Sequence, residues 1–275
     1  MFSLILPCAA ITKGGMIDES EIRQIRAEID AIDTNVHDQL VRRVELAIQM
    51  ATAKDKVAAG QPRMRPGREA AILRSLLARH AGPLEFPVVA RIWRELINAN
   101  LRVEGDFRVA LFADGREDVE RAARSQFGDL TPCDPCDTAQ EALTAAAQQA
   151  DTLAVLPFGS GSDDWALLAE ETNQTLGVIA ALPFVMNEGE VASALCIGTM
   201  DREDTGQDTS LAIVEGASKT SEGTVLATTG NRQLRAIEGY VAADAPLWRQ
   251  IREAEGASAV LPIGGYADPI ILGDM

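Results

Sequence analysis

Arginine and lysine side chains recur at spacings that would bring them together on one long helix. Arg43 and Lys54 are eleven residues apart, and a helix turns by about 100° per residue, so the two side chains lie only about 20° apart around its axis. Both can therefore address one ligand. Arg26 precedes Arg43 by seventeen residues and lies about 100° away around the same helix, which suits it to the site of a partner chain. Such cations are typical of a site for a small polyanion.

Polar residues at two further places could complete this site. Arg68 and Glu69 open a second helix that is expected after Pro66. Asn100 and Glu104 are four residues apart and would share one face of a third helix. Together these side chains could enclose a dianion. Each of them alone is better explained by a surface charge or a helix-stabilising pair, so only the combination is informative.

The apolar pattern predicts the helices that must position these residues. Apolar residues recur at three- and four-residue steps between residues 19 and 58, which predicts one long helix, and they are Ile22, Ile25, Ile29, Ile32, Val36 and Leu40. At 1.5 Å per residue this helix would extend roughly 60 Å, longer than a unit of about ninety residues can cover alone, so a partner chain is expected. Further helices are predicted over residues 68–80 and 87–104. The third should carry one apolar face of Val88, Val89, Ile92, Trp93, Leu96 and Ile97.

Length and composition place these helices in a larger chain. The chain has 275 residues, which favours two units, and its hydrophobic fraction of 47% is typical of a globular protein. No apolar run approaches the roughly 20 residues of a membrane helix, so no membrane span is expected. Residues 1–15 contain a short apolar stretch with no positive charge before it. Such a stretch makes a poor signal peptide, so we expect a cytoplasmic protein. We interpret residues 1–15 as disordered or as an overlong start.

Charge and cysteine content exclude several classes of function. Residues 1–104 carry 15 Lys and Arg against 13 Asp and Glu, whereas the rest carries 10 against 28. An acidic second unit disfavours nucleic-acid binding. Four cysteines are too few for a disulfide scaffold, and the pair Cys133 and Cys136 lacks a second pair of metal ligands. With only two histidines as well, we expect neither a metal nor another cofactor.

The chain changes character after residue 105. Short apolar runs alternate with polar or helical segments, which predicts an α/β region. The expected strands cover residues 107–112, 153–156, 176–182, 194–197, 210–214, 224–227, 237–242 and 259–263. A further division is expected near residue 205.

In order and spacing, the residues of the first unit resemble the all-helical chorismate mutase family over residues 19–104. The resemblance is carried by segments 25–33 and 42–47, by Lys54 and by segment 65–69. It implies an intertwined homodimer of three-helix chains that converts chorismate to prephenate without a cofactor.

The resemblance also implies a role for each candidate residue. Arg43, with Arg26 of the other subunit, would bind the substrate carboxylates, and Lys54 would reach a carboxylate and the ether oxygen. Glu69 would hold the ring hydroxyl, and Arg68 would line the site. The rearrangement is unimolecular, so the site has to hold a compact conformer and stabilise charge at the breaking ether bond.

Two positions depart from the family pattern. Arg65 stands where better-known members often have an aspartate that touches the substrate hydroxyl. Glu104 stands where bacterial members commonly have a glutamine that donates to the ether oxygen, and a carboxylate donates only when protonated. Mutase activity is therefore expected to rise as the pH falls below neutral. Asn100, on the same helix face as Glu104, is expected to contact the substrate, and Arg43, Lys54 and Glu104 are the expected catalytic residues.

The α/β region resembles prephenate dehydratase and ends in a shortened segment that resembles a regulatory ACT domain. The similar segments are 107–115, 127–128, 154–157, 207–211 and 260–266. The dehydratase chemistry is not expected here. The family's Thr-Arg-Phe appears as Ala-Ser-Ala at 192–194, its Glu-Asn as Gly159-Ser160, and charged residues at 116–118 replace small hydroxylated ones.

These resemblances predict four segments and one main function. The segments are residues 1–15, a chorismate mutase domain over 16–105, a degenerate dehydratase-like domain over 106–205 and an ACT-like segment over 206–275. The expected function is a chorismate mutase of aromatic amino acid biosynthesis, with chorismate and a second copy as its partners and a non-catalytic carboxyl-terminal region. The alternatives are a non-catalytic metabolite-binding regulator, a bifunctional mutase and dehydratase, and a lyase that acts on isochorismate on the same helices.

Overall fold

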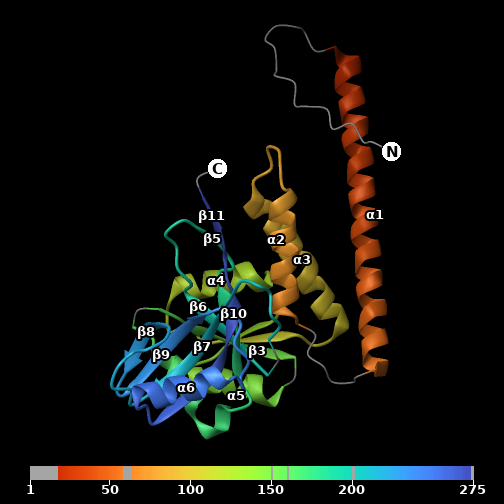
Figure 1. Cartoon of the computed structure of the whole chain (residues 1–275). Helices are drawn as coiled ribbons and strands as arrows, with labels where there is room; N and C mark the ends of the chain where they lie inside the picture. Colours follow the sequence, from red (N-terminus) through yellow and green to blue (C-terminus); the bar gives the residue numbers. More distant parts are fainter. Residues whose placement is uncertain (1–17, 58–63, 150, 160, 200–201, 274–275) are drawn as a thin grey trace. The chain divides into compact units, whose positions relative to one another are not determined.

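The computed structural model describes residues 18–57, 64–149, 151–159, 161–199 and 202–273 (Figure 1). The chain divides into two units, Met1–Leu46 and Ala47–Met275, and the division falls inside the first helix. The expectations for residues 1–15 lie outside the described residues. The expected boundaries at residues 105 and 205 do not coincide with this division and stay predictions.

The long first helix is confirmed as α1 (Glu19–Val57), whose residues up to Leu46 lie in the first unit. Five of the six apolar side chains predicted for its face are between 39% and 55% exposed, and these are Ile22, Ile25, Ile29, Ile32 and Val36. We call them the α1 stripe. Steps of three and four residues place them on one helix face, in the pattern that a coiled-coil seam uses. Within the first unit, these five side chains therefore stay exposed.

The second and third helices are confirmed as α2 (Pro66–Arg79) and α3 (Phe86–Glu104). The predicted apolar face of α3 is only partly right, because Val88 and Ile92 are exposed. The helix instead buries a neighbouring face made of Phe86, Ala90, Arg94, Ile97, Asn98 and Leu101. Arg94 and Asn98 can be buried because residues distant in sequence supply their hydrogen-bond partners, which helical periodicity cannot reveal.

The α/β prediction is confirmed by a nine-stranded sheet in the order β2-β1-β3-β6-β4-β10-β7-β9-β8. Strand β1 pairs in parallel with β2 and β3, whereas β6 and the strands from β7 to β9 pair antiparallel with their neighbours. The strands are β1 (Arg108–Leu111), β2 (Cys133–Pro135), β3 (Thr152–Pro157), β4 (Gly177–Leu182), β6 (Ala194–Gly198), β7 (Asp208–Glu215), β8 (Thr224–Thr229), β9 (Arg232–Glu238) and β10 (Ala259–Ala267). A separate parallel pair joins β5 (Val185–Asn187) to β11 (Ile270–Leu272).

Most expected strands are found, with two kinds of difference. Strand β9 covers residues 232–238, so it begins before the predicted segment 237–242 and overlaps only the first two residues of that segment. The three-residue strands β2, β5 and β11 were not expected, because strands so short show no alternation. The segment that contains Cys133 pairs along β1 as the edge strand β2.

The sheet continues across residue 205 because β10 lies between β4 and β7. It pairs antiparallel with β7 over most of its length and meets β4 at Gly264, opposite Val178. Gly264 has φ +96°, and a Cβ atom there would lie 2.2 Å from the carbonyl oxygen of Val178. A side chain is excluded both by this backbone conformation and by the close approach of the strands.

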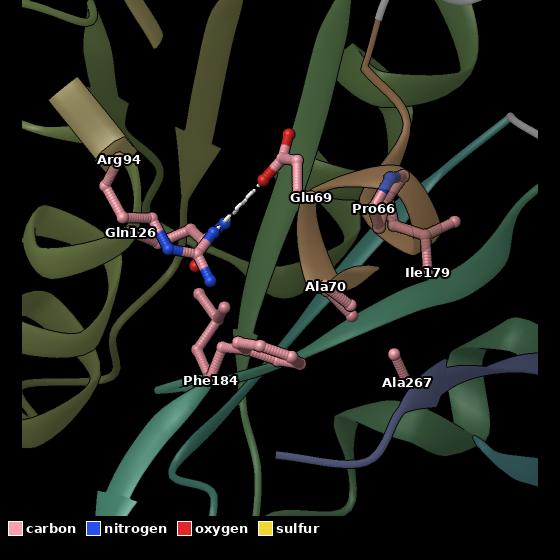
Figure 2. A pocket seen from close by; sticks show the side chains of 10 residues that line it. Pro66, Glu69, Ala70, Arg94, Gln126, Ile179, Phe184 and Ala267 are labelled. Carbon is pink, nitrogen blue, oxygen red and sulfur yellow. Dashed lines mark hydrogen bonds and ion pairs between the residues drawn. The ribbon is translucent and has the colours of Figure 1, made fainter. Parts of the chain in front are cut away.

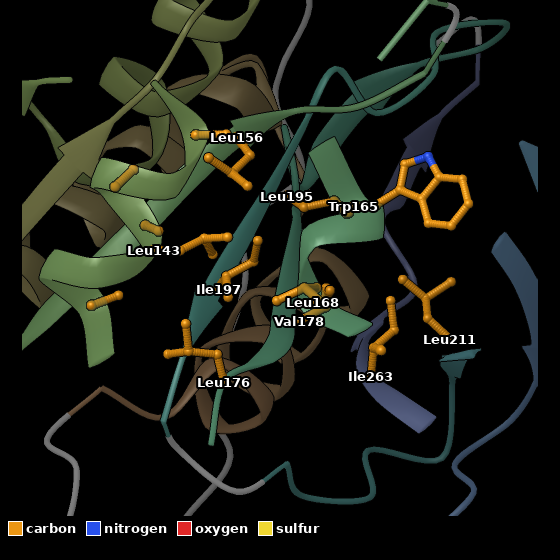
Figure 3. Close-up of a cluster of buried hydrophobic side chains, with 14 of the residues drawn as sticks. Leu143, Leu156, Trp165, Leu168, Leu176, Val178, Leu195, Ile197, Leu211 and Ile263 are labelled. Carbon is orange, nitrogen blue, oxygen red and sulfur yellow. The ribbon is translucent and has the colours of Figure 1, made fainter. Parts of the chain in front are cut away.

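Helices cover both faces of the sheet (Figure 1). Helix α4 (Glu117–Phe127) packs on the face that Leu153 and Val155 of β3 supply. Helix α5 (Ala139–Gln148) and the short 3-10 helices η1 (Asp164–Ala169) and η2 (Glu171–Asn173) lie on the other, with Ala154 and Leu156. This second core runs from Leu143, Trp165 and Leu168 to Leu211 and Ile263 (Figure 3). Helix α6 (Pro246–Glu255) packs its Trp248 and Ile251 against Ala212 and Ile237. Among the described helices, none combines the length and apolar character that crossing a membrane requires.

Candidate functional site

Glu69, in the first turn of α2, lies in a buried cluster of three polar side chains (Figure 2). Its Oε2 atom accepts hydrogen bonds from Arg94 Nη1 of α3 at 3.1 Å and from Gln126 Nε2 of α4 at 3.4 Å. Glu69 is 7%, Arg94 8% and Gln126 5% exposed. The cluster therefore joins the helical hairpin α2–α3 to the α/β part of the second unit.

Burial dominates the electrostatics of this cluster. It raises the pKa of the Glu69 carboxyl, which the charge of Arg94 and the hydrogen bond from Gln126 lower only in part. Burial likewise lowers the pKa of Arg94, against the attraction of Glu69. Each charge has lost its hydration and depends on the other for compensation. Loss of either side chain would leave its partner buried without a counter-charge.

Among the described residues, Glu69 lines a very small cavity. It measures about 10 Å³, and its apolar wall comes from the α/β part through Ile179, Leu182, Phe184 and Ala267. The Arg94 guanidinium lies 5.4 Å from the centroid of the Phe184 ring, and both side chains line the cavity. A cavity of this size holds about one water molecule. This cavity is too small to hold a ring-sized substrate.

The start of α2 is fastened to the segment that precedes β7. Arg65, at the N-cap of α2, donates from Nε and Nη2 to the carboxylate of Glu203. Two residues later, a Cβ atom at Gly67 would lie 3.1 Å from Thr205 Cγ2 and 3.3 Å from Glu203 Cβ. The absence of a side chain at Gly67 lets the helix and this segment approach closely.

Arg74, in the middle of α2, makes a third attachment. Its Nη1 donates to Thr205 Oγ1 at 2.9 Å, and its Nη2 donates to the carbonyl oxygens of Gln207 at 2.9 Å and Asp268 at 2.8 Å. A side chain held by three hydrogen bonds fixes the helix firmly. We call the contacts of Arg65, Gly67, Glu69 and Arg74 with the α/β part the α2 clamp.

The other expected site residues are distributed over both units. Arg26 and Arg43 lie on α1 in the first unit, with Arg26 exposed and Arg43 partly buried. Lys54 is on the same unbroken helix, but its side chain lies outside the described residues. Arg43 and Lys54 can lie on one helix face only if the helix is unbroken between them. The helix is continuous from Arg26 to Lys54.

The candidate residues of α2 and α3 differ in their surroundings. Arg68 is exposed beside the buried Glu69. Asn100 is partly buried, and its Oδ1 atom is shielded without a hydrogen-bond donor among the described residues. A buried acceptor of this kind would gain from a donor on a ligand or a partner chain. Glu104 is the last residue of α3 and is partly exposed.

The described residues contain no candidate metal cluster, and the pKa values of Cys133 and Cys136 are raised. No group of three or more histidine, cysteine, aspartate or glutamate side chains there could hold a metal ion. Cys133 and Cys136 are free thiols, and burial together with nearby acidic groups raises the pKa of both. Such thiols stay protonated at neutral pH and are poor nucleophiles.

At the turn where the dehydratase resemblance places small hydroxylated residues, the chain forms a local ion pair. Arg116 donates to both carboxylate oxygens of Asp118, at 3.2 and 2.7 Å, and to the carbonyl oxygen of Phe158 at 3.0 Å. The hydrogen bond to Asp118 raises the pKa of Arg116 and lowers that of Asp118. The guanidinium is thus occupied by groups of its own chain.

Comparison with known proteins places the helical part in a family. The family model described as chorismate mutase type II matches residues 25–105. A 4-amino-4-deoxychorismate mutase from Streptomyces venezuelae is 31% identical over 91 residues, which make up 32% of this chain and 85% of the relative. The chain belongs to the type II chorismate mutase family. The resemblance inferred from the sequence is confirmed for this region.

Longer relatives extend the similarity beyond the chorismate mutase region. A bifunctional chorismate mutase/prephenate dehydratase from Pseudomonas aeruginosa is 26% identical over 151 residues, covering 54% of this chain and 41% of the relative. The chain thus spans about two fifths of the length of that relative. A prephenate dehydratase structure from Streptococcus mutans aligns with a TM-score of 0.38 and 12% identity, covering 60% of this chain and all of the other.

Sequence reasoning missed the partners of Glu69. Arg94 occupies a step of four between Ala90 and Asn98 on the face of α3 that is buried. An arginine on a buried face needs a carboxylate, which is a signal the sequence does carry. Gln126 gave no signal, because its proximity to Glu69 depends on how α4 packs against α3.

Proposed function

We propose that this chain catalyses the rearrangement of chorismate to prephenate at a site built by residues 25–105. The proposal rests on membership of the type II chorismate mutase family together with the helical placement of Arg26, Arg43, Lys54 and Arg68. The reaction needs no nucleophile and no redox group. Cations on helices suit both of its requirements, which are a compact substrate conformer and stabilised charge at the ether oxygen.

Five of the candidate residues have specific roles in this proposal. Arg43 binds a carboxylate and Lys54 reaches the ether oxygen from the same face of α1, while Arg26 completes the site of a second subunit. Asn100 and Glu104 approach from α3, where the unsatisfied Oδ1 atom of Asn100 can accept a hydrogen bond from the substrate. The product, prephenate, would serve aromatic amino acid biosynthesis.

We further propose that the active form is a homodimer. The α1 stripe leaves five apolar side chains exposed, and α3 exposes Val88 and Ile92 as well. Covering such surfaces with a second copy removes apolar area from water, at about 25 cal/mol for each Å². We also propose a cytoplasmic location. We propose that the α/β part is non-catalytic, which the local ion pair of Arg116 with Asp118 supports.

The test is chorismate turnover by the purified full chain, with prephenate and phenylpyruvate both quantified. Arg43→Ala should lower prephenate formation by at least a hundredfold, whereas Arg42→Ala, its neighbour that pairs with Glu45, should have little effect. Phenylpyruvate formation would instead support the bifunctional alternative. No turnover at pH 5 or 7.5 would refute the proposal and favour the regulator or the isochorismate lyase.

4-Amino-4-deoxychorismate is a necessary second substrate in this assay, because it appears in the name of a relative that is 31% identical. Faster turnover of chorismate is the expected result. A preference for the amino compound would reassign the substrate while leaving the reaction class unchanged.

A further inference from the structure

The inference drawn here rests on the proposed mutase function and concerns its regulation. Two properties of Glu69 conflict with each other. The family resemblance assigns this carboxylate to the ring hydroxyl of the substrate, but the structure buries it against Arg94 and Gln126 beside a cavity of about 10 Å³. Chorismate cannot enter a space that holds one water molecule.

The α/β part supplies the apolar cover of Glu69, whereas its ion-pair partner Arg94 comes from α3. Gln126 belongs to α4, Ile179 and Leu182 to β4, and Phe184 follows β4 directly. The remaining contacts of the α2 clamp also come from this part, through Glu203, Thr205, Gln207 and Asp268. One region of the chain therefore both holds α2 in place and closes the approach to its carboxylate.

We propose that the α/β part is an autoinhibitory element that clamps α2 and withholds Glu69 from the substrate. The mutase region is active when α2 separates from this surface. Opening breaks the polar contacts of the clamp, of which the half-exposed pair Arg65–Glu203 contributes little to stability. It also uncovers the apolar cluster that Ala70 and Leu73 of α2 form with residues of the α/β part. The activity of the whole chain is the activity of the open form multiplied by its population.

A disulfide can lock the clamp for a direct test. A Cβ atom at Gly67 would lie 3.3 Å from Glu203 Cβ, close to the 3.5 to 4.5 Å that a disulfide requires. The full chain with Gly67→Cys and Glu203→Cys should lose at least tenfold in kcat/KM for chorismate when oxidised, and regain it with a reductant. The two single variants, treated identically, control for oxidation of Cys133 and should not respond. An oxidised, cross-linked chain as active as its reduced form would overturn the proposal.

A release variant tests the opposite direction. Gln126→Ala removes a donor of the α/β part and should raise kcat/KM for chorismate severalfold while the melting temperature falls. Gln140→Ala on α5, which loses hydrogen bonds to Thr144 and Asn173 instead, should leave kcat/KM unchanged. An unchanged or lower kcat/KM in folded Gln126→Ala would overturn the proposal.

Two failures can be told apart. If the wild-type chain turns over chorismate but neither the lock nor the release changes its rate, the clamp proposal is wrong and the mutase function stands. If the wild type, the reduced double-cysteine chain and Gln126→Ala are all inactive, the mutase function itself is wrong and the clamp proposal falls with it.

Discussion

Arg235 Nη1 lies 2.7 Å from Glu255 Oε1 in an ion pair that is almost completely buried, with side chains 1% and 0% exposed. The pair joins β9 to the last residue of α6. The backbone nitrogen and hydroxyl of Ser221 donate to the same oxygen at 2.7 and 2.8 Å, and Gln233 Oε1 accepts from Arg235. The contacts fasten the segment between β7 and β8 to the end of α6.

Breaking this pair should destabilise the second unit strongly. Arg235→Met leaves the Glu255 carboxylate buried without a counter-charge, which costs about 3 to 5 kcal/mol of unfolding free energy. Denaturant unfolding measures the loss. Arg232→Met removes a partly exposed partner of Glu215 and should cost less than about 1 kcal/mol. Equal losses in the two variants would contradict this account.

The same pair predicts how stability depends on pH. Burial opposes ionisation of Glu255, but the hydrogen bonds from Arg235 and Ser221 outweigh it and lower the pKa from 4.5 to about 2. Because the folded state then holds the proton less tightly than the unfolded state, the stabilisation is complete above about pH 5 and is lost between pH 4.5 and 2. Melting temperatures of wild type and Glu255→Gln should therefore converge over that interval. A difference that stays constant from pH 6 to 3 would contradict the lowered pKa.

Gly264 should tolerate no side chain. In Gly264→Ala the new Cβ atom would meet the carbonyl oxygen of Val178 at 2.2 Å, at a backbone φ of +96° that alanine disfavours. We expect the join between β4 and β10 to open, with a fall of several degrees in melting temperature or a failure to fold. Gly273→Ala, which has no neighbour within 4 Å, is the matched control and should melt like wild type.

Glu104 should make mutase activity depend on pH. A carboxyl group donates to the ether oxygen only when protonated, so kcat/KM should rise as the pH falls from 8 to 5. Glu104→Gln donates at every pH and should flatten the profile. A wild-type profile that is flat over this range would exclude a donor role for Glu104.

The three helices could be predicted from the sequence because their patterns are long and local. The α1 stripe repeats over four helical turns, and Pro66 marks the start of α2. The strands of four residues or more were mostly found for the same reason, whereas β2 and β11 are too short to alternate. Periodicity in the sequence therefore predicted which helices and strands exist better than it predicted which residues they contact.

The surroundings of Glu69 could not be predicted, for a physical reason. Its burial depends on Gln126 and Phe184, which approach only after α3 packs on α4 and β4 joins the sheet. The sequence gives the residue type and the helix position, which is why Glu69 was recognised as a candidate. It gives no measure of how accessible the carboxylate is once the chain has folded.

The position of β10 has a consequence for how the protein is made. Residues 259–267 form a middle strand of the sheet, yet they are the last of its nine strands to leave the ribosome. Until then the nascent chain holds two half-sheets, in which β4 and β7 present bare edges that can pair with other chains. Synthesis that stalls before residue 259 should yield an aggregating product, and chaperone demand should be greatest just before β10 emerges.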